Sequence, residues 1–359
     1  LQCDWRDAER VFINSYGGGN FLTVDGGETW MVSSKGYTGA QVKGIAPSAS
    51  TQGRVYVRGM TGPFASQNGG NDWEGLGYGP ATGEGGSIVV DPNDDLHLLL
   101  AGPDGYFESF DGGMEWQMIE SNVFSQIGLM PPSEFVFSPQ DSDTVFALVA
   151  DPDCFERGGQ EGLSDGCPES DKVGLAVTRD GGQTWTKSSL ESGHVISLAI
   201  APGNGPMYAV VSGKGVFRSE DHGVSWTLAN ANPLNAEYFH AVVAVDHNDP
   251  YRVYLGSIEK GLGLSTDAGE TWQLIAAGLI PEIEITDVVV DTAHADVVYA
   301  SSQNAGIFFS KDGGMTWNVH NEGLTNRDVW CLALTADGGV LYAGTNGAGV
   351  FRLGSGALD

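Results

Sequence analysis

One eight-residue pattern recurs seven times along this chain: Ser or Thr, any residue, Asp or Asn, any residue, Gly, two further residues and Trp. Successive copies stand 43, 43, 69, 41, 46 and 45 residues apart. A repeat of this period predicts a fold built from stacked copies of one unit. Its third position is occupied by Asp25, Asn68, Asp111, Asp180, Asp221, Asp267 and Asp312. Its last position is occupied by Trp30, Trp73, Trp116, Trp185, Trp226, Trp272 and Trp317.

The chemistry of the repeat predicts a tight turn between two strands. The Asp or Asn side chain can accept hydrogen bonds from backbone N–H groups of the residues that follow it. A Gly pair supplies the positive φ angles that a tight hairpin turn requires. The Trp begins the next strand and offers a large apolar surface to the neighbouring unit. In two copies His222 and Ala268 replace the first Gly, which predicts that this position does not need a positive φ.

Short apolar runs surround the copies of the repeat. Residues 288–291 form one such run, residues 297–300 a second, and residues 306–310 a third that enters the repeat. A short fourth run follows the Trp. Four short strands about every 45 residues are typical of β-propeller blades. The sequence therefore predicts an all-β fold: a single β-propeller of four-stranded antiparallel blades.

The number of blades follows less directly. Each of the seven copies marks one unit, and residues 329–334, 340–343 and 349–353 supply three more strands without a copy. Residues 3–13 align without gaps on residues 90–100, so the first unit already contains the end of its own innermost strand. We therefore favour eight blades, the last one partial, with seven as the alternative. One propeller domain is predicted over residues 1–359.

Composition limits the classes of partner. The chain has 46 Asp and Glu against 17 Lys and Arg, a formal charge of −29. This balance argues against nucleic acid, because neutralising phosphates requires clustered Lys and Arg. It argues against anionic membrane surfaces for the same reason, and no run of 18 apolar residues predicts a membrane span. No phosphate-binding loop or zinc-protease motif is present in the sequence, and we assign no metal site and no cofactor.

Four cysteines allow three pairings. Cys154 and Cys167 bracket a Gly- and acid-rich stretch, which predicts a disulfide-bounded insert at residues 151–172 within the fourth blade. Cys3 and Cys331 lie near opposite ends of the chain, and a bond between them would join the first and last units of the ring. Two disulfides favour an extracytoplasmic location, secreted or periplasmic. The alternative is four free thiols, with Cys331 a small buried apolar residue.

The strand order places function on one face. In a blade of strands a to d, the a–b and c–d turns share one face, so all seven repeats lie together and are predicted to be structural. His97, His247 and His294 lie in or beside a–b turns, and we expect them to be solvated or locally bonded. The opposite face carries the longer connections, where binding is commonly placed. Its candidate binding residues are Tyr37, Arg58, Tyr78, Glu84, Phe124, Tyr238, His240, Glu284, Asp328 and Trp330.

The repeat resembles the Asp box, also called the BNR repeat, and the resemblance covers nearly the whole chain. Single-chain propellers of this kind resemble photosystem II stability/assembly factors and the ligand-binding propeller of sortilin. The resemblance implies an assembly scaffold or a peptide-binding protein. Two groups of Asp-box enzymes, sialidases and xyloglucan-type glucanases, are also similar. The early Phe/Tyr-Arg-Ile-Pro segment typical of sialidases is absent from this sequence.

We therefore predict a non-catalytic binding or scaffold propeller, expected to be monomeric, that engages a peptide, protein or glycan on the face opposite the repeats. The alternative is a glycoside hydrolase, sialidase-like or glucanase-like, that uses paired carboxylates near the central channel. Glu84, Glu284 and Asp328 are the candidate acids for that alternative.

Overall fold

A computed structural model of the chain is almost entirely β-sheet. It describes residues 2–4, 7–15, 19–32, 41–60, 62–76, 86–102, 105–120, 122–129, 132–149, 174–190, 193–231, 233–235, 241–258, 260–280, 283–294 and 296–354. The described helices are short: α1 (Asn122–Gln126) and the 3-10 turn η1 (Pro233–Asn235). Each sheet is an antiparallel meander, in which consecutive strands pair.

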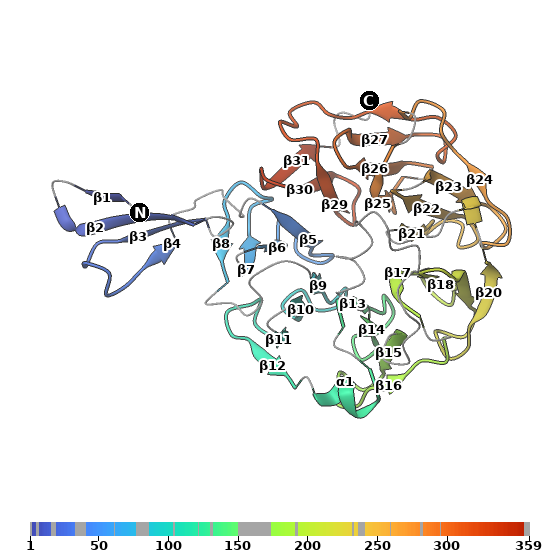
Figure 1. The fold of residues 1–359 in the computed structure, drawn as a ribbon, viewed down its shortest axis with the longest axis horizontal. Helices are drawn as coiled ribbons and strands as arrows, with labels where there is room; N and C mark the ends of the chain where they lie inside the picture. Colours follow the sequence, from blue (N-terminus) through green and yellow to red (C-terminus); the bar gives the residue numbers. More distant parts are fainter. Residues whose placement is uncertain are drawn as a thin grey trace, which may run out of the picture.

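Seven sheets surround a central axis, and we number them ring sheets 1 to 7 in chain order (Figure 1). Ring sheet 1 has β5 (Val42–Pro47), β6 (Val55–Gly59), β7 (Gly62–Ser66) and β8 (Glu74–Gly75). Ring sheet 2 has β9 (Ile88–Val90), β10 (Leu98–Gly102), β11 (Gly105–Ser109) and β12 (Gln117–Ile119). Ring sheet 3 has β13 (Glu134–Phe137), β14 (Val145–Val149), β15 (Gly174–Thr178) and β16 (Thr186–Lys187).

The second half of the ring repeats this layout. Ring sheet 4 has β17 (Val195–Ile200), β18 (Met207–Val211), β19 (Gly215–Ser219) and β20 (Thr227–Asn230). Ring sheet 5 has β21 (Ala241–Val245), β22 (Val253–Ser257), β23 (Gly261–Ser265) and β24 (Gln273–Leu274). Ring sheet 6 has β25 (Ile285–Val290), β26 (Val298–Ser302), β27 (Gly306–Ser310) and β28 (Asn318–Val319). Ring sheet 7 has only β29 (Val329–Leu334), β30 (Val340–Thr345) and β31 (Val350–Gly354).

The ring closes with seven blades, so the favoured count of eight is wrong. β29 lies directly beside β5, and Tyr342 of ring sheet 7 packs against Val42 and Val55 of ring sheet 1. An isolated bridge also joins Gln41 to Asn346. Because the first and last ring sheets already contact each other, no further blade separates them.

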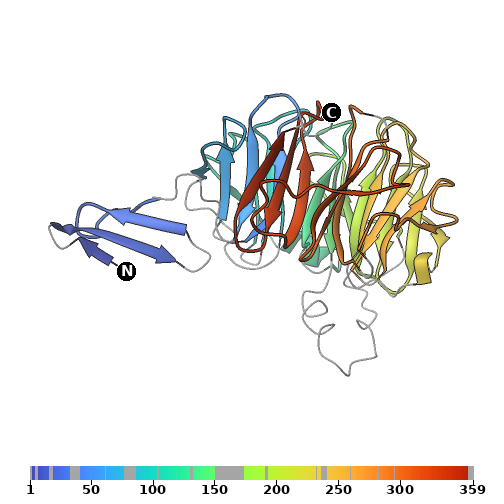
Figure 2. The ribbon, with the colours of Figure 1, turned by 90° about the horizontal axis from the view of Figure 1, so that it is seen from above.

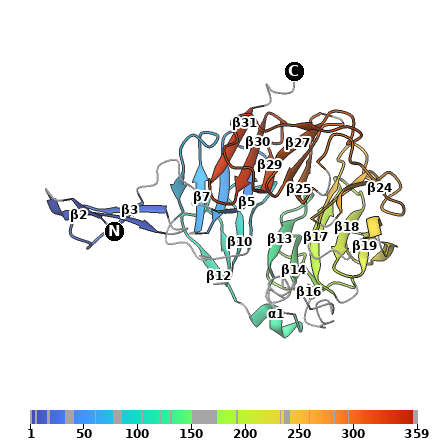
Figure 3. The ribbon, with the colours of Figure 1, turned by 45° about the horizontal axis from the view of Figure 1, so that its top comes forward.

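The first copy of the repeat belongs to a separate N-terminal sheet. This sheet has β1 (Gln2–Asp4), β2 (Asp7–Ser15), β3 (Gly19–Thr23) and β4 (Met31–Val32). Figures 2 and 3 show it outside the ring, in blue. The predicted unit therefore forms as a four-stranded sheet, but it does not take a place around the axis.

The predicted Cys3–Cys331 disulfide is not formed. The Cys331 thiol is free, and its Sγ lies 3.9 Å from the carbonyl oxygen of Val42. The reason is the ring closure: β29 packs beside β5, whereas Cys3 lies on β1 of the N-terminal sheet. The predicted Cys154–Cys167 pair and the insert at 151–172 lie outside the described residues.

The core lies between neighbouring ring sheets. Every residue of β6, β14, β18, β22 and β26 is buried, because each second strand is covered by a sheet on both sides. This explains why these strands are continuous apolar runs rather than alternating patterns. The repeat Trp side chains contribute to the packing between sheets. For example, Trp317 of ring sheet 6 packs against Tyr254 and Ile275 of ring sheet 5.

The repeat turns share one hydrogen-bonding scheme. In the turn of ring sheet 6, the hydroxyl of Ser310 donates to Asp312 and accepts from the N–H of Gly314, at 2.7 and 2.8 Å. The Asp312 carboxylate then accepts the N–H and the hydroxyl of Thr316, at 2.8 and 2.6 Å. The hydrogen bond from the Thr316 hydroxyl helps to lower the pKa of Asp312. The predicted acceptance of backbone N–H groups by the acidic residue is therefore confirmed.

The first Gly position of the turn does adopt a positive φ in all seven copies. His222 and Ala268 have φ values of 56° and 61°, close to the 68° of Gly313. The prediction that this position tolerates a negative φ is wrong. The backbone N–H here points at the preceding a–b turn: Ala268 N donates to Tyr251 O at 3.0 Å and Gly313 N to Asp296 O at 2.9 Å. That hydrogen bond is made whichever side chain is present.

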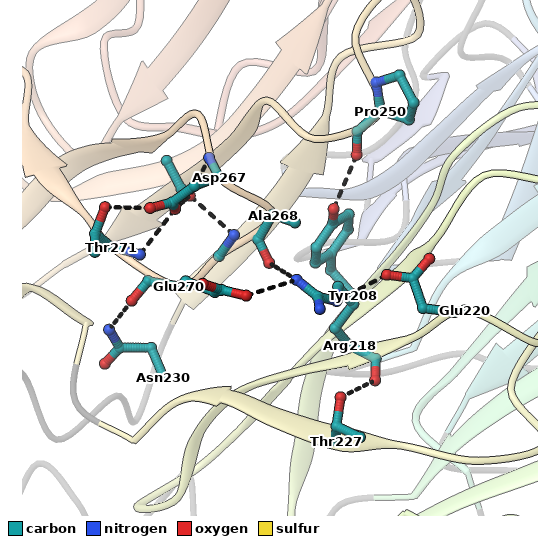
Figure 4. Close-up of polar contacts among 12 residues, drawn as sticks. Tyr208, Arg218, Glu220, Thr227, Asn230, Pro250, Asp267, Ala268, Glu270 and Thr271 are labelled. Atoms are coloured by element: carbon teal, nitrogen blue, oxygen red, sulfur yellow. Dashed lines mark hydrogen bonds and ion pairs between the residues drawn. The ribbon is translucent and has the colours of Figure 1, made fainter.

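Polar contacts tie several turns to the sheet before them, as Figure 4 shows for ring sheets 4 and 5. The Tyr208 hydroxyl donates to Pro250 O at 2.9 Å, and Arg218 Nη1 donates to Ala268 O at 3.1 Å. Asn230 Nδ2 donates to Glu270 O at 2.7 Å. At other junctions an ion pair does the same, as between Arg54 and Asp95 at 2.8 Å. The face that carries the turns is therefore built to hold the blades together.

Candidate functional site

The predicted binding face divides into three groups of residues. Asp328, Trp330 and Glu284 lie where the predicted strand order places them, at or just before the starts of inner strands. Arg58 and Phe124 are fully buried, so neither can contact a partner: Arg58 lies within β6, and Phe124 of α1 packs on Trp185. The remaining predictions, Tyr37, Tyr78, Glu84, Tyr238 and His240, fall outside the described residues.

Asp328 and Trp330 form one structured cluster. The indole Nε1 of Trp330 donates to Asp328 Oδ1 at 2.9 Å. Asn346, in the connection between β30 and β31, donates from Nδ2 to Asp328 Oδ2 at 2.8 Å and from its backbone N–H to Asp328 O at 2.9 Å. Asp328 N in turn donates to Asn326 Oδ1 at 2.9 Å. These bonds fix the half-buried indole and carboxylate in one orientation.

Two residues of ring sheet 1 complete the cluster. The Lys43 ammonium lies 3.5 Å from the centroid of the Trp330 ring, a cation–π contact across the seam between ring sheets 7 and 1. Gln41, which bridges to Asn346, has a buried Oε1 for which the described residues supply no donor. We call Gln41, Lys43, Asp328, Trp330 and Asn346 the Trp330 cluster. It offers a cation, an aromatic surface and an amide acceptor at the axial ends of the inner strands.

A polar layer lies deeper along the same inner strands. In each ring sheet, the residue three positions before the end of the inner strand belongs to this layer. Its members are Gly44, Ser87, Glu134, Ser197, Val242, Asp287 and Cys331. Several of them tie one inner strand to the next: Ser197 Oγ accepts from Val243 N at 3.0 Å, and Asp287 Oδ2 accepts from Leu332 N at 2.8 Å.

The carboxyl groups of this layer are strongly perturbed. Burial raises the pKa of Asp287 to about 6, although two backbone N–H groups donate to it. Burial and the charge of Asp287 raise the pKa of Glu134 to about 7. Burial also raises the pKa of the Cys331 thiol, so this thiol is not a reactive thiolate near neutral pH. The titratable groups of this layer, Glu134, Asp287 and Cys331, are half-buried, and their raised pKa values favour the protonated forms at neutral or mildly acidic pH.

Sequence reasoning missed Lys43, Gln41 and the two carboxyl groups of this layer. A signal was present for three of them, because Lys43, Glu134 and Asp287 each interrupt or begin an otherwise apolar run. Charged residues in apolar strands indicate a special environment. No comparable signal marks Gln41, whose importance comes from its place at the ring seam.

A second polar cluster lies on the turn face. His97 is buried, with Nδ1 3.0 Å from Asp91 Oδ2 and Nε2 2.9 Å from Glu108 Oε1. Its ring stacks on Phe110 at 4.6 Å. Burial alone would lower the pKa of His97, but the hydrogen bonds to Glu108 and Asp91 raise it. From the sequence we expect His97 to be either solvated or locally bonded, and the structure shows the second. The histidine ring also borders a cavity of about 250 Å³ between ring sheets 2 and 3.

No group of three or more His, Cys, Asp or Glu side chains arranged to hold a metal ion is found among the residues that the structure describes. Within the same residues, no helix has the length and apolar character that crossing a bilayer requires.

Comparison with known proteins gives a fold. No protein-family model and no curated protein matches the sequence. Among solved structures, YCF48 bound to D1 peptide aligns with a TM-score of 0.63 and 15% identity over 89% of this chain and 93% of that chain. YCF48 from Cyanidioschyzon merolae aligns with a TM-score of 0.62 and 15% identity, over 87% and 94%. This chain is a propeller similar in fold to YCF48.

A more distant match is the GH74 enzyme from Niastella koreensis, with a TM-score of 0.41 and 14% identity over 99% of this chain and 75% of that chain. The YCF48 matches confirm the part of the sequence analysis that expected a β-propeller fold.

Proposed function

We propose that this propeller is a binding protein that captures an extended polypeptide segment on the face opposite the repeat turns. The observation that carries the proposal is the Trp330 cluster. There, a Lys ammonium over an indole, an immobilised carboxylate and an amide oxygen for which the described part of the chain supplies no donor lie together at the ring seam. Aromatic residues held rigidly beside polar groups are the usual anchors of protein interfaces.

The chemistry of the cluster suits a polypeptide. Gln41 Oε1 is a buried acceptor that has no donor among the residues the structure describes, and leaving such a group unpaired costs about 1–3 kcal/mol. A backbone N–H of a bound segment would satisfy it. The ammonium of Lys43 suits a carboxylate or carbonyl oxygen of the same segment. The YCF48 structure described as bound to a D1 peptide supports the proposal at the level of the fold.

Selection from a random peptide library on the immobilised protein, followed by calorimetry, tests this function. Trp330→Ala and Gln41→Ala should each weaken binding of the selected peptides about tenfold or more, because they remove an anchor and an acceptor. The matched control is Met315→Ala, an exposed residue on the turn face, which should bind as the parent does. Peptides that bind all three variants equally, or an empty selection, would contradict the proposal. A glycan array run in parallel identifies a sugar-binding protein instead.

We further propose that the seven repeats are Asp boxes and that the chain works outside the cytoplasm, in oxidising surroundings. The remaining support for that location is the Cys154–Cys167 spacing in the sequence. Peptide mass mapping without reduction tests it: Cys154 and Cys167 should appear in one linked peptide, and Cys331 should be alkylated only after unfolding. Recovery of Cys154 and Cys167 as free thiols from the native host would contradict the proposed location.

A further inference from the structure

Ring sheet 7 differs from the other six at its outer edge. Ring sheets 1 to 6 each end in a short fourth strand that follows a repeat turn. In ring sheet 7, β31 pairs with β30, and no described residue pairs with its other edge. An open strand edge presents unpaired N–H and C=O groups that can accept another strand. The seam beside the Trp330 cluster is therefore bordered by an incomplete sheet.

Among the described residues, the junction between ring sheets 6 and 7 also has no tryptophan. At the junction of ring sheets 5 and 6, Trp317 comes from the repeat turn and covers Tyr254. At the junction of ring sheets 6 and 7, Phe309, Phe351 and Leu353 are only partly buried. His320 contacts Phe309 edge-on at 5.4 Å and fills part of the space. In the part of ring sheet 7 that the structure describes, two features of the other ring sheets are therefore absent: an outer strand and the aromatic side chain that precedes it.

Both missing parts occur in the N-terminal sheet. The turn of residues Thr23–Trp30 has the hydrogen bonds of the ring turns: Gly27 N donates to Thr23 Oγ1 and Thr29 N to Asp25 Oδ1, each at 2.9 Å. It ends in Trp30 and continues into β4, which has two residues like β8, β16, β24 and β28. No such turn follows β31 in the described residues, where Leu353 takes the place of the Ser or Thr.

The position of β4 in the chain matches that of an outer strand of the preceding blade. Nine residues separate β4 from the inner strand β5. Within the ring, nine residues separate β28 from β29, and ten separate β24 from β25. These connections run from the outer edge of one sheet to the inner strand of the next. The connection from β4 to β5 has the length to do the same from ring sheet 7 to ring sheet 1.

We propose that the segment Thr23–Val32 exchanges between two partners in the same chain: β3 in the N-terminal sheet, and the open edge of β31 in ring sheet 7. In the second arrangement β4 becomes the fourth strand of ring sheet 7, and Trp30 covers the junction with ring sheet 6. The register follows from the other sheets. Phe309 pairs with Asn318 and Leu22 with Met31, and Arg352 holds the equivalent position in β31, so Met31 would face Arg352.

Two cysteine pairs distinguish the arrangements. In a background with Cys3, Cys154 and Cys167 replaced by Ser, Met31→Cys with Leu22→Cys reports pairing with β3. Met31→Cys with Arg352→Cys reports pairing with β31. Directly opposed strand residues have the Cβ separation that a disulfide needs. After mild oxidation we expect the second pair to form a bond within a monomer, detected by mass mapping of the linked peptide.

The controls make the result decisive. Met31→Cys with Lys311→Cys places the second thiol on the turn of ring sheet 6 and should stay reduced. The proposal is overturned if the variant with Met31→Cys and Leu22→Cys forms its disulfide while the variant with Met31→Cys and Arg352→Cys stays reduced. Linkage of Met31→Cys to Arg352→Cys only between two chains would overturn it as well, because the occupant would then be a second copy. Parent-like circular dichroism of both double variants establishes that the linkage is read in the folded protein.

Discussion

The two faces of the ring are built on different principles. On the turn face, one hydrogen-bonding scheme recurs, and the same kinds of residue bind each sheet to the one before it, as at Ser310–Asp312 and Ser219–Asp221. On the opposite face, the Trp330 cluster occurs at the seam between ring sheets 7 and 1. Repetition therefore serves stability, and the place where the ring departs from repetition is the one where we propose that a polypeptide binds.

The sharpest test of this division compares two tryptophans. Trp317 on the turn side is almost fully buried between ring sheets, so Trp317→Ala should lower the free energy of unfolding by about 3–5 kcal/mol. Trp330 on the opposite side is half-buried, and Trp330→Ala should lower it by about 1–2 kcal/mol while weakening ligand binding. Urea unfolding followed by circular dichroism measures both losses. Equal losses in the free energy of unfolding would mean that the two tryptophans contribute equally to stability.

The half-buried carboxyl groups of the inner strands test whether these positions cost the protein stability. The folded-state pKa of Glu134, about 7, is above its ordinary 4.5, so the folded protein retains a proton that the unfolded chain releases. The free energy of unfolding should therefore fall as the pH rises from about 4.5 to about 7. Glu134→Gln should flatten this dependence and be more stable than the parent by about 2–3 kcal/mol at pH 8.

Glu284→Gln is the matched control, because Glu284 is exposed on the same face and should leave the pH dependence unchanged. Parallel urea unfolding curves at pH 5 and pH 8 provide the measurement. A parent whose stability does not change between these values would show that Glu134 is not protonated in the folded state.

Substitutions at two glycines of the turn face distinguish the cost of backbone strain from the cost of steric crowding. Gly182 has φ 83° and open space around an added Cβ, so Gly182→Ala should cost about 1–2 kcal/mol from strain alone. Gly113 has φ 89°, and an added Cβ would lie 2.6 Å from Cδ1 of Leu76 and 3.1 Å from Cζ2 of Trp116. Gly113→Ala should therefore cost about 1 kcal/mol more. Thermal unfolding of the two variants side by side decides whether the packing between sheets tolerates a methyl group.

The features that the sequence predicts correctly lie mainly on the turn face, where the repeat determines the structure. The seven turns, the Asp and Trp roles and the apolar second strands are local consequences of one repeated pattern, and the structure confirms them in Asp312, Thr316 and Trp317. The blade count was wrong because it depends on which sheets meet at the seam. That contact joins β29 to β5 across most of the chain, and the repeat carries no information about it.

The candidate site was predicted in part for a related reason. Asp328 and Trp330 follow from their position at the start of an inner strand. Arg58 and Phe124 were wrong because residues 58 and 124 face the core, and a residue type alone does not tell which side of a strand or helix it occupies. Lys43 reaches Trp330 only because the ring closes between them, so its role requires the tertiary structure.

The smallest expected effect concerns the turn positions where the repeat departs from Gly. His222 and Ala268 hold φ values of 56° and 61°, and a left-handed conformation costs a non-Gly residue about 1–2 kcal/mol. Gly avoids that strain but loses more chain entropy on folding, about 0.5–1 kcal/mol. His222→Gly should therefore raise the free energy of unfolding by about 0.5–1 kcal/mol, whereas Ala268→Gly also removes a buried methyl group and should change it by less than about 0.5 kcal/mol. Arg179 donates to the backbone carbonyl of residue 222, at 2.7 Å, so this hydrogen bond between sheets survives the substitution. Ala244→Gly, in the strand β21, is the control and should be destabilised. A loss of stability in all three variants would mean that the turn face selects side chains at these positions, and that its uniformity does not come from the backbone alone.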